Sequence, residues 1–140
     1  MTREALVQEI VESMAKCQRP ANLTDWQKIG LSRAQIGMLY MLSYHKQLQI
    51  KQIALSLGTS KSAASQLIEP LVAKGLVSRQ TDRKDRRAAN LKLTTVGNNT
   101  LKKVNKLKYD NLRSRLQVLS PKELEQMAAL YRKLAVRANK

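Results

Sequence analysis

The fold class is decided by residues 50–77, which read IKQIALSLGTSKSAASQLIEPLVAKGLV. The first part carries apolar residues at the spacing of a short helix: Ile50, Ile53, Ala54 and Leu57. Gly58 suits the left-handed residue that follows a helix C-terminus, and Ser60 can cap a second helix. The apolar stripe of that second helix comprises Ala64, Leu67, Ile68 and Leu71. Two helices joined by a turn with glycine, the second with one apolar and one small polar face, are the pattern of a helix-turn-helix.

A hairpin is predicted directly after these helices. Beyond Gly75 the apolar period changes from 3.6 to 2, which predicts strands over 76–81 and 88–93. The connection between them is Asp82-Arg83-Lys84-Asp85-Arg86-Arg87, so the two strands form a basic hairpin, or wing. Pro70 interrupts the helix before the hairpin. Because proline removes a backbone donor, we expect a kink or an early loosening there.

Amphipathic helices flank these elements on both sides. Apolar spacing and capping residues predict them over 3–17, 32–46, 95–119 and 121–138, although Gly97 is expected to weaken the first turn of the third. Residues 19–31, which contain Pro20, Asn22 and Gly30, predict a connector. The first helix and the last two carry more apolar surface than one small core can absorb. They predict a homodimer interface, and a monomer that uses these stripes internally is the alternative.

Composition excludes several classes of protein. The 140 residues contain 26 Lys and Arg against 10 Asp and Glu, a net charge of +16, which indicates attraction to a polyanion. Twelve of these cations and three of the anions lie in residues 76–119, as expected of a binding face. With one Cys and one His, we expect no disulfide, no metal site and no cofactor. The sequence also shows no motif that pairs a nucleophile with a base, so an enzyme is not expected. Because the chain lacks both a signal peptide and an apolar run of about 18 residues, we expect no membrane association and a cytoplasmic location.

The order and length of these elements resemble the MarR family of winged-helix transcriptional regulators over nearly the whole chain. The similar motifs are the recognition helix that follows Leu57-Gly58-Thr59-Ser60-Lys61-Ser62, the wing tip at residues 82–87, and the exit Leu93-Thr94-Thr95-Val96-Gly97. The wing departs from the family pattern at Lys84, where an arginine is usual and where lysine cannot donate in a bidentate fashion.

The resemblance implies a mainly α fold with a small β-hairpin wing. This is a winged helix-turn-helix with N- and C-terminal dimerisation helices. It implies a single domain over residues 1–140, in which 31–94 form the DNA-binding region and 1–30 and 95–140 form the dimerisation helices. The fold in turn predicts double-stranded DNA as the partner, with a pseudo-palindromic operator because the homodimer is two-fold symmetric.

Within this fold, the helix from Ser60 to Gly75 is expected to enter the major groove. The side chains expected to contact base edges are Ser62, Ser65 and Gln66. Ser60 and Lys61, at the positive end of the helix, suit phosphate. The other cations expected on DNA lie in the wing, namely Arg79, Arg83, Lys84, Arg86 and Arg87. Asp82 and Asp85 are expected to orient neighbouring arginines and hold the turn.

The expected function is a repressor whose DNA affinity is modulated by a small-molecule ligand or an oxidant. The resemblance implies an effector pocket, for which the candidates are Trp26, Met38, Tyr40 and Tyr44, although such residues are more often core. Cys17 is the candidate redox sensor, and burial on the first helix is the simpler explanation of a lone free cysteine.

Two other classes of nucleic-acid-binding protein fit the charge. One is an architectural nucleoid protein that coats DNA without sequence preference, for which +16 would suffice. The other is an RNA-binding protein, which is disfavoured because four Tyr, one Trp and no Phe leave few rings to stack on bases. A preference for one DNA site over bulk DNA would separate the regulator from both.

Overall fold

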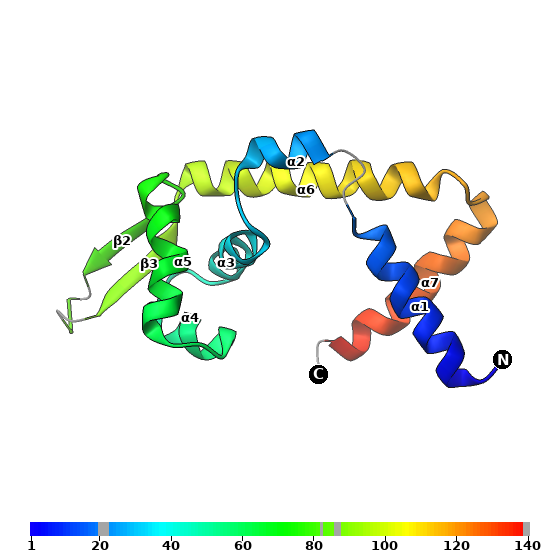
Figure 1. Ribbon diagram of the computed structural model, residues 1–140, viewed down its shortest axis with the longest axis horizontal. Coiled ribbons are helices and arrows are strands. Elements are labelled where there is room, and N and C mark those ends of the chain that lie inside the picture. Colours follow the sequence, from blue (N-terminus) through cyan, green and yellow to red (C-terminus); the bar gives the residue numbers. More distant parts are fainter. Residues whose placement is uncertain (20–22, 82, 86–87, 139–140) are drawn as a thin grey trace. The chain divides into compact units, whose positions relative to one another are not determined.

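Seven helices and three strands form in the part of the chain that the computed structural model describes, residues 1–19, 23–81, 83–85 and 88–138 (Figure 1). The helices are α1 (Arg3–Cys17), α2 (Leu23–Ile29), α3 (Arg33–Tyr44), α4 (Ile50–Leu57), α5 (Lys61–Ala73), α6 (Thr95–Leu116) and α7 (Pro121–Ala138). The strands are β1 (Leu48–Gln49), β2 (Val77–Thr81) and β3 (Ala89–Leu93). The predicted mainly α fold with a small β-hairpin wing is confirmed.

Two elements and one proline differ from the sequence prediction. The predicted connector contains α2, because Leu23, Trp26 and Ile29 recur at helical spacing and the last two are half-buried. The strand β1 pairs with β3, and two residues are too few to show the alternation that predicts a strand. Pro70 does not end α5, which continues to Ala73. The predicted early loosening of this helix is therefore wrong.

The chain forms two compact units. The reading unit is Leu23–Lys106, and the helical unit combines Met1–Asn22 with Leu107–Lys140. The division falls inside α6, whose first part belongs to the reading unit. The division implied by the resemblance, with 31–94 as the DNA-binding region and 1–30 and 95–140 as the dimerisation helices, concerns function and stays a prediction.

The reading unit has a continuous apolar core. Its largest fully buried side chains are Met38, Leu39, Ile53, Ile68, Leu71, Val77, Leu91 and Val104. They come from α3, α4, α5, the sheet and the first part of α6, and burying each contributes about 1.5–3 kcal/mol. The sheet order is β1-β3-β2 with antiparallel pairing throughout, and Val77 faces Leu93 where the hairpin meets the core. The core therefore fixes α5 and the base of the wing on one support.

The helical unit is built differently. Side chains of α6 hold the end of α1, since Asn111 Nδ2 donates to the Cys17 carbonyl over 3.2 Å and Arg115 Nη2 donates to the Arg19 carbonyl over 3.0 Å. The helices α1 and α7 contain no buried side chain among residues 3–17 and 121–137. Their apolar stripes are exposed, including Val7, Ile10, Val11, Leu130, Tyr131 and Leu134.

Among the described residues, no helix combines the length and the apolar character that crossing a bilayer requires.

Candidate nucleic-acid interface

The helix α5 has one buried face and one polar face. Its first turn is capped by Ser60, whose Oγ accepts the backbone N–H of Ala63 over 3.1 Å. The residues fully buried against the core are Ala64, Ile68 and Leu71. On the other side, Lys61, Ser62 and Gln66 are exposed and Ser65 is half-buried. The structure thus brings together on one helix face the three side chains predicted to contact bases.

The turn between α4 and α5 determines where this face begins. Gly58 ends α4 with a φ of +62°, a left-handed conformation that a residue with a Cβ adopts only at a cost. The next N–H, of Thr59, returns to the Ala54 carbonyl over 3.0 Å. Because Ala54 belongs to the core, this turn fixes the N-terminus of α5 and its free N–H groups relative to the core.

The wing consists of β2, β3 and the connection between them. Five cross-strand pairs hold it, from Val77 opposite Leu93 to Thr81 opposite Ala89. At the tip, Arg83 and Lys84 are exposed, and the Ala88 N–H donates to the Asp85 carbonyl over 3.0 Å. The other predicted tip residues, Asp82, Arg86 and Arg87, lie outside the described residues. The tip of the wing therefore presents at least two exposed cations.

Arg79, one of the cations expected on DNA, forms an ion pair with α5. Its Nη2 lies 2.5 Å from Oε1 of Glu69 on α5, and the two side chains are 37% and 55% exposed. The signal that could have revealed this is the alternation of β2, since Arg79 lies two residues after the buried Val77 and therefore on the same face of the strand. The wing and α5 are thus joined by an ion pair.

The C-terminal end of α5 is tied to the start of α6. Thr94 Oγ1 donates to the Gly75 carbonyl over 2.6 Å and accepts the Gly97 N–H over 3.0 Å, so one hydroxyl joins both elements. Gly97, expected to weaken α6, has a packing role instead. A Cβ at position 97 would lie 2.2 Å from the Leu76 carbonyl oxygen, closer than real Cβ atoms come. The absence of a side chain allows α6 to start directly against the backbone that follows α5.

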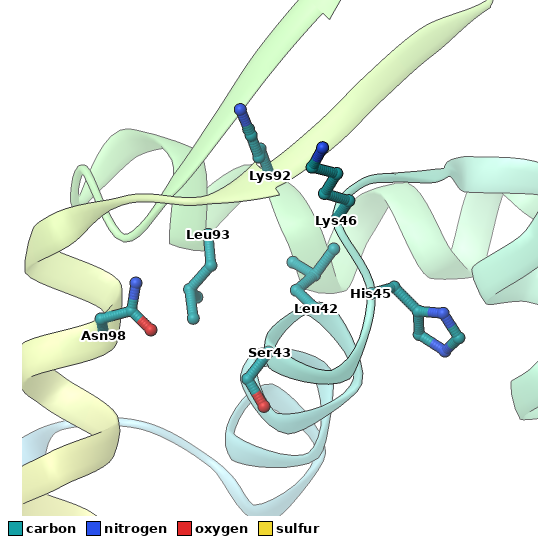
Figure 2. A pocket seen from close by; sticks show the side chains of 7 residues that line it. All are labelled: Leu42, Ser43, His45, Lys46, Lys92, Leu93 and Asn98. Carbon is teal, nitrogen blue, oxygen red and sulfur yellow. The ribbon is translucent and has the colours of Figure 1, made fainter.

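A small cavity of about 180 Å³ lies in the reading unit where α3 ends and α6 begins (Figure 2). It is lined by Leu42, Ser43, His45, Lys46, Lys92, Leu93 and Asn98. Figure 2 shows the amino groups of Lys46 and Lys92 extending to the same side, with Ser43 at the opposite end. None of the four predicted effector residues lines this cavity.

Those four residues occupy different environments. Met38 is fully buried in the core, and Tyr44 is 78% exposed. Tyr40 is half-buried and its hydroxyl donates to Oδ1 of Asn105 on α6, while Trp26 is half-buried in α2. Cys17 is exposed at the end of α1, so the expectation that it is buried is wrong. The cysteine is the predicted sensor residue, and its redox role remains a prediction.

The comparisons with known proteins agree with this geometry. Residues 29–88 match the family model described as the MarR family. The HTH-type transcriptional repressor MdtR of Bacillus subtilis is 30% identical over 117 residues, covering 84% of this chain and 76% of MdtR. The chain belongs to the MarR family.

Solved structures extend the match to both units of this MarR-family chain. The YusO protein from Bacillus subtilis has 27% identity and a TM-score of 0.78, covering 96% of this chain and 98% of YusO. A mutant of MepR from S. aureus, solved bound to an oligodeoxyribonucleotide, has 26% identity and a TM-score of 0.68 over 99% of both chains. The winged helix-turn-helix described above is therefore that of a MarR-family transcriptional regulator.

Proposed function

We propose that this MarR-family chain is a homodimeric, sequence-specific DNA-binding repressor that recognises a pseudo-palindromic operator. The observation that carries the proposal is the polar face of α5, placed by the core beside the basic wing. In this proposal Ser62, Ser65 and Gln66 contact bases in the major groove. The contacts to phosphate come from Ser60 and Lys61 and from the wing cations Arg83, Lys84, Arg86 and Arg87. The names of MdtR, a repressor, and of the DNA-bound MepR mutant support it.

The charge distribution explains why two surfaces are needed. Within α5, Lys61 is the only cation and Glu69 the only anion, so the helix itself is neutral. The attraction to phosphates therefore comes from the wing and from the overall charge of +16, and it is the same for every sequence. Hydrogen bonds from short polar side chains to base edges supply the preference for one site.

The operator preference can be tested by competition. Fragments of the source genome are selected on the protein, and the recovered site is then competed with bulk DNA at physiological salt. A regulator prefers its site by roughly 10³-fold or more, and the site is a palindrome. Equal affinity for all fragments would instead identify an architectural protein that coats DNA.

Gln66→Ala tests base contact by α5. We expect it to cost about 1–3 kcal/mol of binding free energy on the operator, because one polar contact to a base edge is lost. Binding to random DNA should be nearly unchanged. Gln47→Ala, at another exposed glutamine of the reading unit, is the matched control and should alter neither. Equal losses on operator and random DNA would contradict base contact by Gln66.

The dimer part of the proposal is supported by the exposed stripes of the helical unit. Ile10 is 56% exposed and Leu134 is 61% exposed, each among other exposed apolar residues of its own helix. Sedimentation at micromolar concentration should give twice the mass of the 15.8 kDa chain. Ile10→Asp should shift the species toward 15.8 kDa, because burying an unpaired carboxylate in an interface is costly. Leu55→Asp, on the 76% exposed leucine of α4, should leave the mass unchanged.

Modulation by a ligand or an oxidant is the remaining part of the proposal. A repressor of this kind loses affinity when the two recognition helices change their spacing, because both must enter the major groove one helical turn apart. Cys17 is exposed at the end of α1 in the single chain. One equivalent of peroxide should weaken operator binding by the wild type and leave Cys17→Ser unaffected; unaltered binding by the wild type would exclude the redox role.

A further inference from the structure

The ion pair between Glu69 and Arg79 has no obvious place in a DNA-binding surface. Glu69 is the only acidic residue of α5. It follows Gln66 by three residues and Ser65 by four, which places it on the face proposed to enter the major groove. A carboxylate at this place is repelled by phosphates, so its presence there costs binding affinity unless it performs another task.

The strand geometry shows what Glu69 does to Arg79. Arg79 is paired with Leu91 across the hairpin, and Leu91 is fully buried. Residues directly opposite in an antiparallel pair have their side chains on the same side of the sheet. Arg79 therefore starts from the inner face of β2, where Glu69 holds its guanidinium 2.5 Å away. The pair links the middle of the wing strand to the last part of α5.

We propose that Glu69 is a positioning residue for DNA recognition, which holds Arg79 and so sets the wing against the recognition helix. The ion pair has a second effect, because it keeps one guanidinium away from phosphate and so limits binding that ignores sequence. Glu69 thereby lowers affinity for bulk DNA and favours the operator. This inference rests on the proposed function, in which α5 and the wing bind the same DNA.

The central experiment measures the salt dependence of binding to random DNA and to the selected operator for Glu69→Gln. This variant keeps the shape of the side chain and releases Arg79. One additional phosphate contact should steepen the slope of log K against log salt by about 0.9. The ratio of affinities at 50 and 200 mM salt then rises by about 3.5-fold on random DNA. The preference for the operator should fall, because only operator binding needs the wing in its fixed position.

A double-mutant cycle distinguishes this role from simple repulsion between Glu69 and phosphates. In an Arg79→Gln background the released guanidinium is absent, so Glu69→Gln should no longer steepen the slope. If the carboxylate acted only by repulsion, the substitution would strengthen binding equally in both backgrounds, and the proposal would be overturned. Asp25→Asn is the matched control, since it removes one negative charge and the 3.9 Å ion pair with Lys28 on α2. It should change neither the slope nor the preference.

Arg79→Gln alone is an independent test of the positioning role. If Glu69 holds Arg79 as proposed, this variant leaves the slope on random DNA unchanged and weakens operator preference. A slope that flattens by about one unit would show that Arg79 contacts phosphate directly, which would overturn the positioning role. Arg79→Lys keeps the charge and should therefore retain more of the operator preference than Arg79→Gln does. A wild type with no operator preference would refute the proposed function, while the slopes on random DNA would still test the link between Glu69 and Arg79.

Discussion

The reading unit and the helical unit differ in how much of their apolar surface is buried. All the buried apolar side chains found in the described residues lie between Ile36 and Val104, inside the reading unit. The helical unit has apolar stripes on α1 and α7 that remain exposed. A helix with one apolar face is stable in water only when that face is covered. The reading unit therefore completes its own core, whereas the helical unit leaves apolar surface exposed that the proposed dimer would cover.

The strongest test of this comparison replaces one leucine in each unit. Leu71→Ala, at a fully buried site, should lower the free energy of unfolding by about 2–5 kcal/mol at every protein concentration. Leu134→Ala should destabilise by an amount that depends on protein concentration, because its exposed side chain would be covered only in the proposed dimer. Chemical denaturation over a hundredfold range of concentration separates the two. Equal, concentration-independent losses would mean that the helical unit has a core of its own.

A smaller effect is expected where α6 starts against the reading unit. Gly97→Ala should lower the free energy of unfolding by about 1–3 kcal/mol, because the added methyl group displaces the Leu76 backbone or the Leu93 side chain. Operator binding should weaken as well, since Leu76 joins α5 to the wing. Gly37→Ala, in α3 with open space at its Cβ, is the control and should be neutral or slightly stabilising. A stable Gly97→Ala variant would show that this junction is loosely packed.

The smallest expected change in stability comes from the first turn of α7 in the helical unit. The backbone N–H of Ser120 donates to the Glu123 carboxylate over 2.8 Å, and the Ser120 hydroxyl donates over 2.9 Å. These bonds, the backbone one first, hold the pKa of Glu123 below its ordinary value. A depressed pKa stabilises the fold above the pKa of the unfolded chain, about 4.3, and that contribution is lost as the pH falls through the folded pKa.

Glu123→Gln should therefore reduce stability at neutral pH and lose this difference from wild type in acid. Thermal unfolding between neutral and acid pH measures it, with Glu125→Gln as a control for the same change of charge. A difference that persists unchanged in acid would show that the carboxylate hydrogen bonds do not matter.

Local signals in the sequence predicted most of the helices. The Ser120-Pro121 start of α7 and the Gly58 end of α4 were predictable because capping depends on a few neighbouring residues. The capping box of α3, with Ser32 and Gln35 bonded reciprocally, is another such case. Where the signal lies within one turn of helix, the sequence suffices.

Features that depend on distant residues were harder to predict. The strand β1 exists because Leu48 meets Leu91, and Gly97 is required because α6 approaches Leu76. The pairing of Arg79 with Glu69 was missed because a count of cations takes no account of which face of a strand each one occupies. The polar face of α5 was correctly located, whereas the four effector candidates occupy unrelated environments.

The order of the sheet, β1-β3-β2, has a consequence for solubility. An open strand edge can recruit a strand from another molecule, and such pairing propagates into fibres. Here one edge is the two-residue β1, and the other, β2, is five residues long and carries an arginine and three other polar residues. Both edges are poor templates for strand addition. If the exposed helices form the proposed dimer, these edges favour a closed assembly through the helices over aggregation through the sheet.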